Sequence, residues 1–444
     1  MAKRPDAAGR LPSLPQEPAD RILAPLAQFL HVEAAGGIVL LACTAAALVL
    51  ANSPLAEGFL QFWKTPIGFQ IGEFSSVHSL KHWINDGLMV IFFFVIGLEV
   101  KRELVTGELR ELRRAALPVA AAVGGMVAPA AIYLALQWGE EGARGWGIPM
   151  ATDIAFVVGC MALLGPRVPH SLRVTVLSLA IVDDIGAILV IAVGYTEGLD
   201  WTALALGAAG ILLIVALIRV GLRNMALHAV LGILVWFAFH ESGVHATIAG
   251  VILGLITPTE SWVSRGLWGE IVEKAAHVVR GKGPEAAWQH DALRHVEQAA
   301  RESISPLERL EASLHPWVGF LIMPAFALAN AGVPLELSDF GAPVSLAVMA
   351  GLGIGKPLGI VLSSWLAVRL GWARLPHGVG WGVILAAGWL AGIGFTMALF
   401  IAGLALEGAL LDTAKIGILG GSLASAVLGM GLLAALLPPR DRKA

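Results

Sequence analysis

The sequence predicts an all-α polytopic membrane protein with about 12 transmembrane helices, on three observations. Of its 444 residues, 57% are hydrophobic and only 14% are charged, whereas an average soluble domain carries about 25% charged residues. The mean hydropathy is +0.76, and apolar stretches follow one another along nearly the whole chain. The connections between these stretches are alternately rich and poor in Lys and Arg, a pattern typical of membrane proteins that cross the bilayer repeatedly.

Most of the apolar stretches approach the about 20 residues that a helix needs to cross a bilayer. In chain order they cover residues 34–52, 83–100, 115–138, 147–164, 171–195, 201–217, 225–239, 245–256, 317–330, 344–368, 381–404 and 416–437. The stretches that begin at 147, 245 and 317 are short. They are therefore candidates for short, tilted or broken helices.

The distribution of basic residues predicts the orientation in the membrane. One set of alternate connections, counted with both termini, holds 24 of the 30 Lys and Arg residues, and the other set holds 4. The remaining two, Arg173 and Lys356, lie inside spans. Because connections rich in Lys and Arg stay in the cytoplasm, both termini are predicted to be cytoplasmic. The expected location is a bacterial-type inner membrane.

The polar segments divide the chain into five parts. These are an arm with a short interfacial helix, spans one to eight, a cytoplasmic segment, spans nine to twelve and a tail, at residues 1–33, 34–256, 257–316, 317–437 and 438–444. The interfacial helix is expected at 22–30, and the arm lacks the features of a signal peptide. In the cytoplasmic segment, apolar residues at helical spacing over 268–279 predict an amphipathic helix.

Residues 65–79, on the outer side, predict a small β-hairpin. Ile67, Phe69 and Ile71 alternate with small or polar residues, and glycines punctuate the stretch. An exposed hairpin edge can pair with a second copy of the chain, which would give a homodimer. An ordered loop that lies on its own bundle fits the pattern equally well.

The strongest functional signal is a pair of carboxylates in the middle of an apolar span. Asp183 and Asp184 are positions 13 and 14 of the 25 residues in 171–195. One ionisable side chain at the bilayer centre costs at least about 2.5–3.5 kcal/mol, and two adjacent carboxylates also repel each other. A carboxylate pair that served only to satisfy polar groups between helices would destabilise the bundle. The pair therefore indicates a cation or proton site.

Two other spans carry polar residues at a similar depth. Thr152 and Asp153 lie in GIPMATDIAFVVG, where Pro149 and flanking glycines permit an interrupted helix. Asp153 either completes a cation site with Asp184 or neutralises the positive ends of half-helices, and the pattern leaves both open. Lys356, in GLGIGKPLGIVL, needs a carboxylate partner. Successive helical residues point about 100° apart, so one aspartate of the adjacent pair can meet this lysine while the other faces water.

Enzymatic interpretations fit these residues less well. An intramembrane aspartyl protease needs a second Asp bracketed by glycine, and a membrane prenyltransferase needs DDxxD beside basic residues, whereas this span reads DDIGA. A proton-coupled carrier of an organic solute remains an alternative, although few polar residues lie at mid-membrane to recognise such a molecule. The sequence predicts a secondary transporter without a cofactor, with the lipid bilayer and small cations as partners and no nucleic acid.

Eight stretches, in family order, resemble the NhaA family of sodium/proton antiporters. They are WINDGLMVIFFFVIGLEVKREL, GIPMATDIAFVVG, LAIVDDIGAILVIA, SGVHATIAGVI, LHPWV, ALANAGV, IGKPLGI and GIGFTM. The resemblance implies two inverted repeats, spans 3–5 and 10–12, each with a broken helix that crosses the other at mid-membrane. It also implies exchange of cytoplasmic Na⁺ or Li⁺ for external H⁺, which is electrogenic and regulated by pH.

The resemblance assigns roles to individual residues. Asp184 matches the family's essential cation-binding carboxylate, and Asp183 matches its neighbour, which pairs with the lysine matched by Lys356. Thr152 and Asp153 match the residues beside the site in the first broken helix. Positions implicated in the pH response or in the funnel that leads to the site are matched by Glu99, Glu311, His245 and Asp86.

Overall fold

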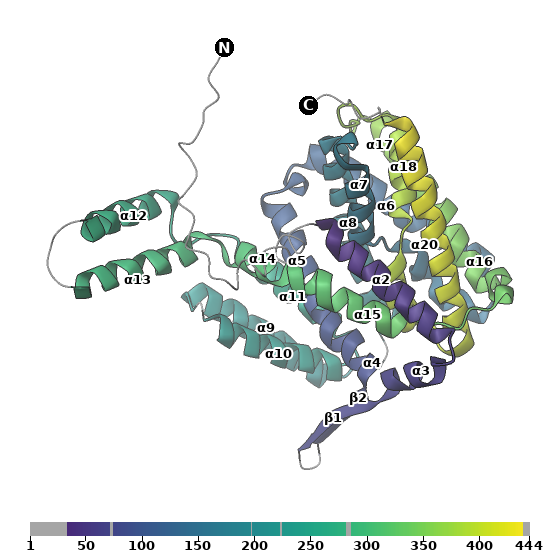
Figure 1. Cartoon of the computed structure of the whole chain (residues 1–444), viewed down its shortest axis with the longest axis horizontal. Coiled ribbons are helices and arrows are strands. Elements are labelled where there is room, and N and C mark those ends of the chain that lie inside the picture. Colours follow the sequence, from purple (N-terminus) through teal and green to yellow (C-terminus); the bar gives the residue numbers. More distant parts are fainter. Residues whose placement is uncertain (1–32, 72–73, 197, 223, 281–285, 438–444) are drawn as a thin grey trace.

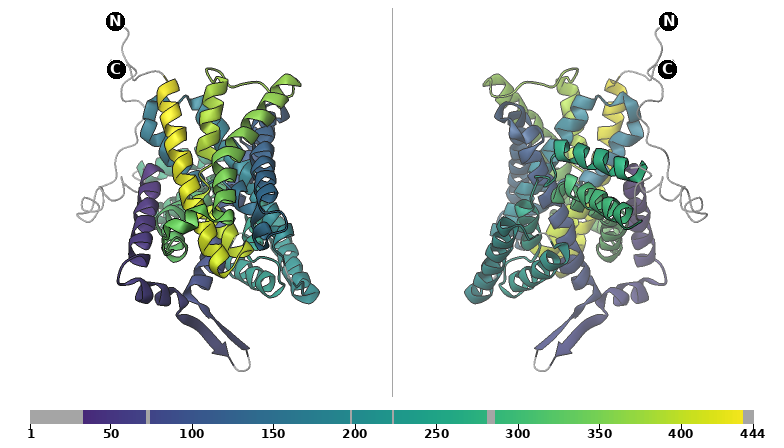
Figure 2. Two further views of the ribbon diagram at one scale, coloured as in Figure 1. Left: turned by 90° about the vertical axis from the view of Figure 1, so that its right-hand side faces the viewer. Right: turned by 90° about the vertical axis from the view of Figure 1, so that its left-hand side faces the viewer.

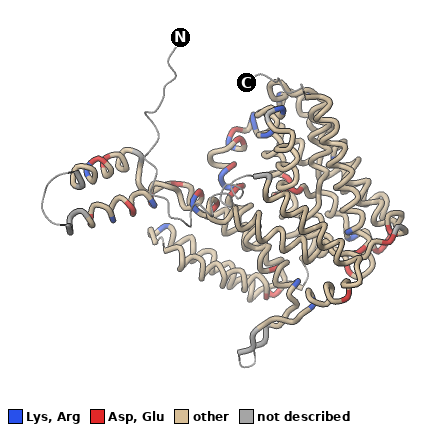
Figure 3. The backbone as a smooth tube through the Cα atoms, in the orientation of Figure 1, with Lys and Arg blue, Asp and Glu red and all other residues tan. Residues whose placement is uncertain are grey.

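The computed structural model describes residues 33–71, 74–196, 198–222, 224–280 and 286–437. Within them the chain forms a bundle of helices with one small hairpin, as Figure 1 shows. Charged residues gather in the connections and on the helices outside the bundle, whereas most of the bundle carries none (Figure 3). The predicted arm, its interfacial helix at 22–30 and the tail at 438–444 lie outside the described residues.

Seven continuous helices of the described residues are long and apolar enough to cross a membrane. They are Leu80–Val105, which contains α4 (Leu80–His82), a π-helical turn and α5 (Met89–Val105); α6 (Leu112–Leu136); α8 (His170–Gly194); α9 (Trp201–Val220); Pro306–Asn330, which contains α14 (Pro306–Trp317) and α15 (Met323–Asn330); Pro343–Arg369, which contains α16 (Pro343–Ala350) and α17 (Lys356–Arg369); and α20 (Gly408–Leu436).

Three further pairs of apolar helices are bent by more than 40° at a short break. They are α2 (Glu33–Ala51) with α3 (Ala56–Lys64), bent by 115°; η3 (Glu141–Met150) with α7 (Ile154–Leu164), by 42°; and α18 (Trp381–Ala391) with α19 (Phe395–Ala405), by 49°. Two shorter apolar helices are α10 (Met225–Glu241) and α11 (Thr247–Ile256). The chain is therefore an all-α polytopic membrane protein, as predicted.

Of the three stretches predicted to be short, tilted or broken, the one at 245 is the short helix α11, the one at 147 is bent, and the one at 317 is part of a long helix. The stretch at 147 is bent as predicted, and its first half is a 3₁₀ helix rich in glycine. The stretch at 317 belongs to a helix of 25 residues that begins at Pro306. The Ser305 hydroxyl accepts a hydrogen bond from the Glu308 amide at 3.2 Å, while the Glu308 carboxylate accepts one from the Ser305 amide. This reciprocal cap starts the helix eleven residues before its apolar part.

The predicted hairpin and the predicted amphipathic helix are both confirmed. Strands β1 (Pro66–Ile71) and β2 (Phe74–Ser79) pair antiparallel, and the hairpin projects from one end of the bundle (Figure 2). In the polar segment, α12 (Arg265–Arg280) packs along α13 (Ala286–Ser303), beside the bundle.

Glycines bring the helices around the centre of the bundle into close contact. A Cβ on Gly124 of α6 would collide with the Gly359 carbonyl oxygen of α17, and a Cβ on Gly359 would collide with the Gly124 carbonyl oxygen. Between α5 and α11, a Cβ on Gly97 would lie 2.6 Å from the Val251 carbonyl oxygen. Close backbone approach of this kind is how helices associate in a membrane, where burial of apolar surface gives little driving force.

Candidate cation site at two broken helices

The two interrupted spans, η3/α7 and α18/α19, meet at their breaks. The amide of Asp153, in the first break, donates a hydrogen bond to the Ile393 carbonyl in the second, at 2.7 Å. In the second break, a Cβ on Gly394 would lie 3.1 Å from the Ala151 carbonyl oxygen. The absence of a side chain at this glycine thus lets the two backbones approach. Irregular backbone at membrane depth is tolerated where it is buried in protein, as here, or lines a water-filled cavity.

Asp153 caps the first turns of both half-helices. One carboxylate oxygen, Oδ1, accepts a hydrogen bond from the Phe156 amide at 3.4 Å, in the first turn of α7. The other, Oδ2, accepts from the Thr396 amide at 3.0 Å and from the Thr396 hydroxyl, in the first turn of α19. A carboxylate at the N-terminus of a helix is stabilised by the helix dipole. Of the two roles that the sequence left open for Asp153, the geometry favours balancing the helix ends.

Asp183 and Lys356 form a fully buried ion pair. The Lys356 ammonium lies 2.6 Å from Asp183 Oδ2 and also donates to the Met150 carbonyl, which ends η3. Both side chains have no accessible surface. The Thr152 hydroxyl is 2.6 Å from the same Asp183 oxygen and 2.8 Å from the Ala391 carbonyl, which ends α18. The ion pair thus contacts the end of η3 directly and is linked to the end of α18 through Thr152.

A π-helical segment places Lys356 in this position. Residues Gly351–Gly355 form the π turn directly before the lysine, and Pro357 follows it. Wide turns of this kind frequently mark functional sites, because they break the regular hydrogen-bond ladder and turn a side chain away from its regular position. From the sequence, Pro357 alone predicted a kink in this helix. In the structure, the irregular helical backbone begins at Gly351, five residues before the lysine.

Two carboxylate oxygens of the site have no hydrogen-bond donor among the described residues. They are Oδ1 of Asp183 and Oδ1 of Asp184, and both are buried. Asp184 is 2% exposed. Since a buried polar atom without a partner is costly, these oxygens need either a proton or a cation. One fully buried lysine lies beside three buried aspartates, so positive charge is in short supply there.

Several contacts of the site were not predicted from the sequence. Thr396 and the carbonyl groups of Met150 and Ala391 all belong to the network around the aspartates. The sequence signals for Thr396 were a hydroxyl residue in an otherwise apolar span and its place in the stretch GIGFTM, and neither pointed to Asp153 as its partner. The two carbonyl groups carry no signal at all, because they become available only where the helices end.

The four residues matched to the pH response or the funnel fall into two groups. In the first, Arg102 of α5 forms an ion pair with Glu311 of α14, and His315 Nδ1 lies 3.9 Å from Glu99 Oε1. The structure therefore brings Glu99 and Glu311 together where α5 meets α14. Glu99 and Glu311 are mostly buried, with 18% and 14% of their side chains exposed.

The second group lies toward the hairpin. Asp86 Oδ2 is 3.5 Å from His82 Nε2 and 3.9 Å from His240 Nδ1. His245 Nδ1 lies 3.0 Å from the Thr247 hydroxyl at the start of α11, and its ring packs against Phe400. Among the described residues, neither Asp86 nor His245 forms a hydrogen bond or an ion pair with Asp183, Asp184 or Asp153.

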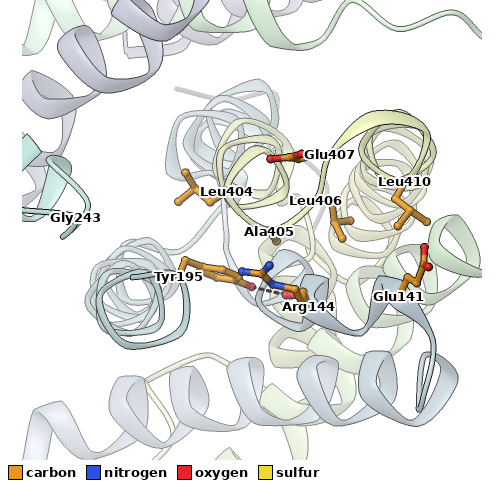
Figure 4. A pocket seen from close by; sticks show the side chains of 9 residues that line it. All are labelled: Glu141, Arg144, Tyr195, Gly243, Leu404, Ala405, Leu406, Glu407 and Leu410. Atoms are coloured by element: carbon orange, nitrogen blue, oxygen red, sulfur yellow. Dashed lines mark hydrogen bonds between the residues drawn. The ribbon is translucent and has the colours of Figure 1, made fainter. Parts of the chain in front are cut away.

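A surface cavity of about 420 Å³ lies between η3 and the connection from α19 to α20, away from the aspartates. Figure 4 shows Glu141, Arg144, Tyr195 and Glu407 around it. The Tyr195 hydroxyl donates to the Arg144 carbonyl at 3.0 Å and accepts from the Gly147 amide at 3.2 Å. None of the predicted site residues lines this cavity.

Comparisons with known proteins cover nearly the whole chain. The family model described as Na+/H+ antiporter 1 matches residues 27–433. Two proteins named Na(+)/H(+) antiporter NhaA, from Rhodopirellula baltica and Rhizobium meliloti, are 55% and 52% identical, covering 98% and 97% of this chain and 99% of each relative. Na(+)/H(+) antiporter NhaA 2 of Vibrio vulnificus is 49% identical over 97% of this chain and 96% of its own. The resemblance seen in the sequence is thereby confirmed, and the chain belongs to the Na+/H+ antiporter 1 family.

Proposed function

We propose that this protein is a secondary transporter that exchanges cytoplasmic Na⁺, or Li⁺, for external H⁺ at the buried aspartates. The antiporter names of its relatives support Na⁺ and H⁺ as the transported ions. Its work is the movement of these ions rather than catalysis. The ions are substrates, and the proposal involves no cofactor.

The observation that carries the proposal is that two neighbouring residues, Asp183 and Asp184, each have one buried carboxylate oxygen without a hydrogen-bond donor among the described residues. In both residues this oxygen is Oδ1. Carboxylate oxygens are ligands suited to hard cations such as Na⁺, and they are also proton acceptors. One cation or protons can satisfy the same oxygens, but not both at full occupancy. Competition between them is the basis of exchange.

Within this site we assign the following parts. Asp184 binds the transported ion, and Asp183 contributes to the same site while Lys356 holds it in place. Thr152 hydrogen-bonds to Asp183 and so couples the site to the first break. Asp153 balances the N-termini of the two half-helices. When the site opens inward, Na⁺ displaces protons, and when it opens outward, protons displace Na⁺.

The architecture proposed for this exchange has twelve spans. The seven long helices, the three bent pairs and the two short apolar helices of the described residues supply this number. Spans 3–5 and 10–12 are proposed as inverted repeats, and the close contact of Gly124 with Gly359 joins the first span of each. The five-part division is kept in this proposal, except that the helix of span nine begins at Pro306, inside the polar segment. Both termini are placed in the cytoplasm and the protein in the inner membrane.

Two further features of the proposal concern regulation and assembly. Glu99, Glu311, His245 and Asp86 are proposed to take part in the pH response or to line the path to the site. A homodimer is proposed to form through the hairpin. On it, Ile67 and Val77 are 48% and 52% exposed and so are accessible to a second copy of the chain.

The test is transport by the purified protein in proteoliposomes that report the pH gradient, with Na⁺, Li⁺ or K⁺ added. We expect Na⁺ and Li⁺ to dissipate the gradient and K⁺ to have no effect. Asp184→Asn removes the charge at nearly unchanged volume and should abolish the response to Na⁺. Asp200→Asn is the matched control, because Asp200 is an exposed cap of α9 that lies outside the site.

Each result has a definite meaning. Activity lost in Asp184→Asn but retained in Asp200→Asn supports exchange at the aspartates. A wild-type protein that responds to none of these cations between about pH 6.5 and 9 would overturn the proposed exchange. Full activity in Asp184→Asn would leave the exchange in place and move the site elsewhere.

A further inference from the structure

Three histidines converge at the end of the bundle that carries the hairpin. His78 belongs to β2, His82 to α4 and His240 to the last turn of α10. One ring nitrogen from each of the three lies within 4.8 Å of the others. Among the described residues, this is the one group of three or more His, Cys, Asp or Glu side chains arranged so closely.

A carboxylate lies beside two of the three histidines. Asp86 Oδ2 lies 3.5 Å from a ring nitrogen of His82 and 3.9 Å from one of His240. His82 and Asp86 are four residues apart, so they lie on one face of a helical turn. The side chain of His82 is 34% exposed, and those of Asp86 and His240 are each 19% exposed. An ion in the surrounding water can therefore reach these atoms.

The donor set and its spacing fit a small divalent cation. Zn²⁺ binds imidazole nitrogen and carboxylate oxygen at about 2.0–2.2 Å in a tetrahedron, which puts neighbouring ligand atoms about 3.3 Å apart. The nitrogens, at most 4.8 Å apart, need to close by no more than about 1.5 Å. The rings of His78 and His82 stack at 4.3 Å between centroids, and the ring of His240 lies edge-on at 5.5 Å from that of His82. The rings must rotate about their side-chain bonds to point the three nitrogen lone pairs at one ion.

Neighbouring groups hold these side chains in place. The Trp236 indole donates a hydrogen bond to the Asp86 carbonyl at 3.1 Å, and its ring stacks on His240 at 5.9 Å between centroids. The Ser79 hydroxyl accepts a hydrogen bond from the His82 amide at 3.2 Å. Contacts of this kind orient metal ligands and contribute to metal affinity.

We propose that His78, His82, His240 and Asp86 bind one Zn²⁺ ion. Imidazole suits Zn²⁺, Cu²⁺ and Ni²⁺, whereas Na⁺ and Mg²⁺ prefer oxygen ligands. The site is therefore distinct from the aspartate site in both place and chemistry. Because its ligands come from the hairpin, from the start of the second span and from α10, bound Zn²⁺ fastens the hairpin to the bundle.

The test is Zn²⁺ binding by the purified full-length chain, prepared without a polyhistidine tag and stripped with a chelator. Competition with a chromogenic chelator gives the affinity and the number of ions bound. We expect one Zn²⁺ per chain, and each of the variants His78→Ala, His82→Ala and His240→Ala should weaken binding at least about tenfold. His377→Ala is the control, since His377 is exposed and stands in a different connection.

X-ray absorption at the zinc edge supplies a measurement that does not depend on transport. The wild type should show three imidazole nitrogens and one oxygen at about 2.0–2.2 Å, and each single variant should lose one imidazole. Any alanine variant that does not remain monodisperse is replaced by its glutamine counterpart. Absence of Zn²⁺ binding by the wild type overturns the proposal. Binding that the three variants weaken no more than His377→Ala does also overturns it.

Discussion

Asp153 accepts two hydrogen bonds from Thr396, although the two residues are 243 positions apart in the chain. The same carboxylate accepts a hydrogen bond from the Phe156 amide. One side chain therefore caps two half-helices that come from different broken spans. Since the N-terminus of each helix carries about half a positive charge, the carboxylate joins the two breaks electrostatically as well as by hydrogen bonds.

Removal of this carboxylate should destabilise the protein. Asp153→Ala leaves two helix starts uncapped, and loss of one cap costs about 0.5–2 kcal/mol, so we expect a total of about 1–4 kcal/mol. Asp153→Asn keeps an acceptor oxygen and should cost less. Reversible denaturation in detergent measures the change. The control is Asp200→Ala, which uncaps α9 alone; an Asp153→Ala variant that unfolds no earlier than this control would contradict the double cap.

Loss of Lys356 should be more damaging than loss of the whole ion pair. Lys356→Met leaves Asp183 buried without its cation, and removal of one partner of a buried pair costs about 3–5 kcal/mol. The double variant Asp183→Asn/Lys356→Met leaves no unpaired charge and should recover a large part of this loss. A double-mutant cycle measures the coupling between the two side chains. Additive effects of the two single substitutions would show that the pair is not coupled.

The contact between α6 and α17 should not tolerate a side chain at Gly359. Gly359→Ala places a Cβ against the backbone of Gly124, and overpacking of this kind costs about 1–3 kcal/mol. The control is Gly431→Ala, because a Cβ on Gly431 of α20 meets nothing within 4 Å. That change should be neutral or should stabilise α20, since Ala is a better helix former than Gly. Equal melting of the two variants would show that α6 and α17 can move apart at little cost.

The contribution of Asp200 to stability should depend on pH. Its carboxylate accepts hydrogen bonds from the Ala203 and Thr202 amides, at 3.2 and 2.7 Å, and these bonds hold the pKa of Asp200 below its usual value. A group with a lowered folded pKa stabilises the fold above its unfolded pKa, which is about 3.9 for Asp. That contribution is lost as the pH falls through the folded pKa. The difference in the free energy of unfolding between wild type and Asp200→Asn should therefore shrink below about pH 4. A difference that stays constant down to about pH 3 would contradict this assignment.

Much of the fold could be predicted from the sequence because membrane spans leave strong local signals. The length of each apolar stretch can be measured directly in the sequence. The period-two pattern at 65–79 likewise predicted the hairpin, because alternation is a local property of a strand. The helix start at Pro306 was missed, since polar residues after Ser305 hide a capping box from a hydropathy pattern.

The site was predictable only in part. Asp183, Asp184 and Lys356 stood out because charged side chains are rare in apolar spans, and the structure does pair Lys356 with Asp183. The partners of Asp153 were not predictable, because no local feature of the sequence indicates that Thr396 contacts this carboxylate. Hydrogen bonds to the carbonyls of Met150 and Ala391 exist only through the position of the breaks.

The meeting of the two breaks also determines the electrical balance of the bundle centre. Each break contributes one helix N-terminus and one C-terminus, whose partial charges of about plus and minus one half cancel. What remains is three buried aspartates and one buried lysine, or a charge of about −2 when all are ionised. One Na⁺ then leaves about one negative charge, whereas two protons leave none. In the proposed exchange, the membrane voltage would therefore act on the charged, sodium-loaded site but not on the neutral, doubly protonated site. The ion-free site, with the largest charge, would be the most costly to move from one side of the membrane to the other.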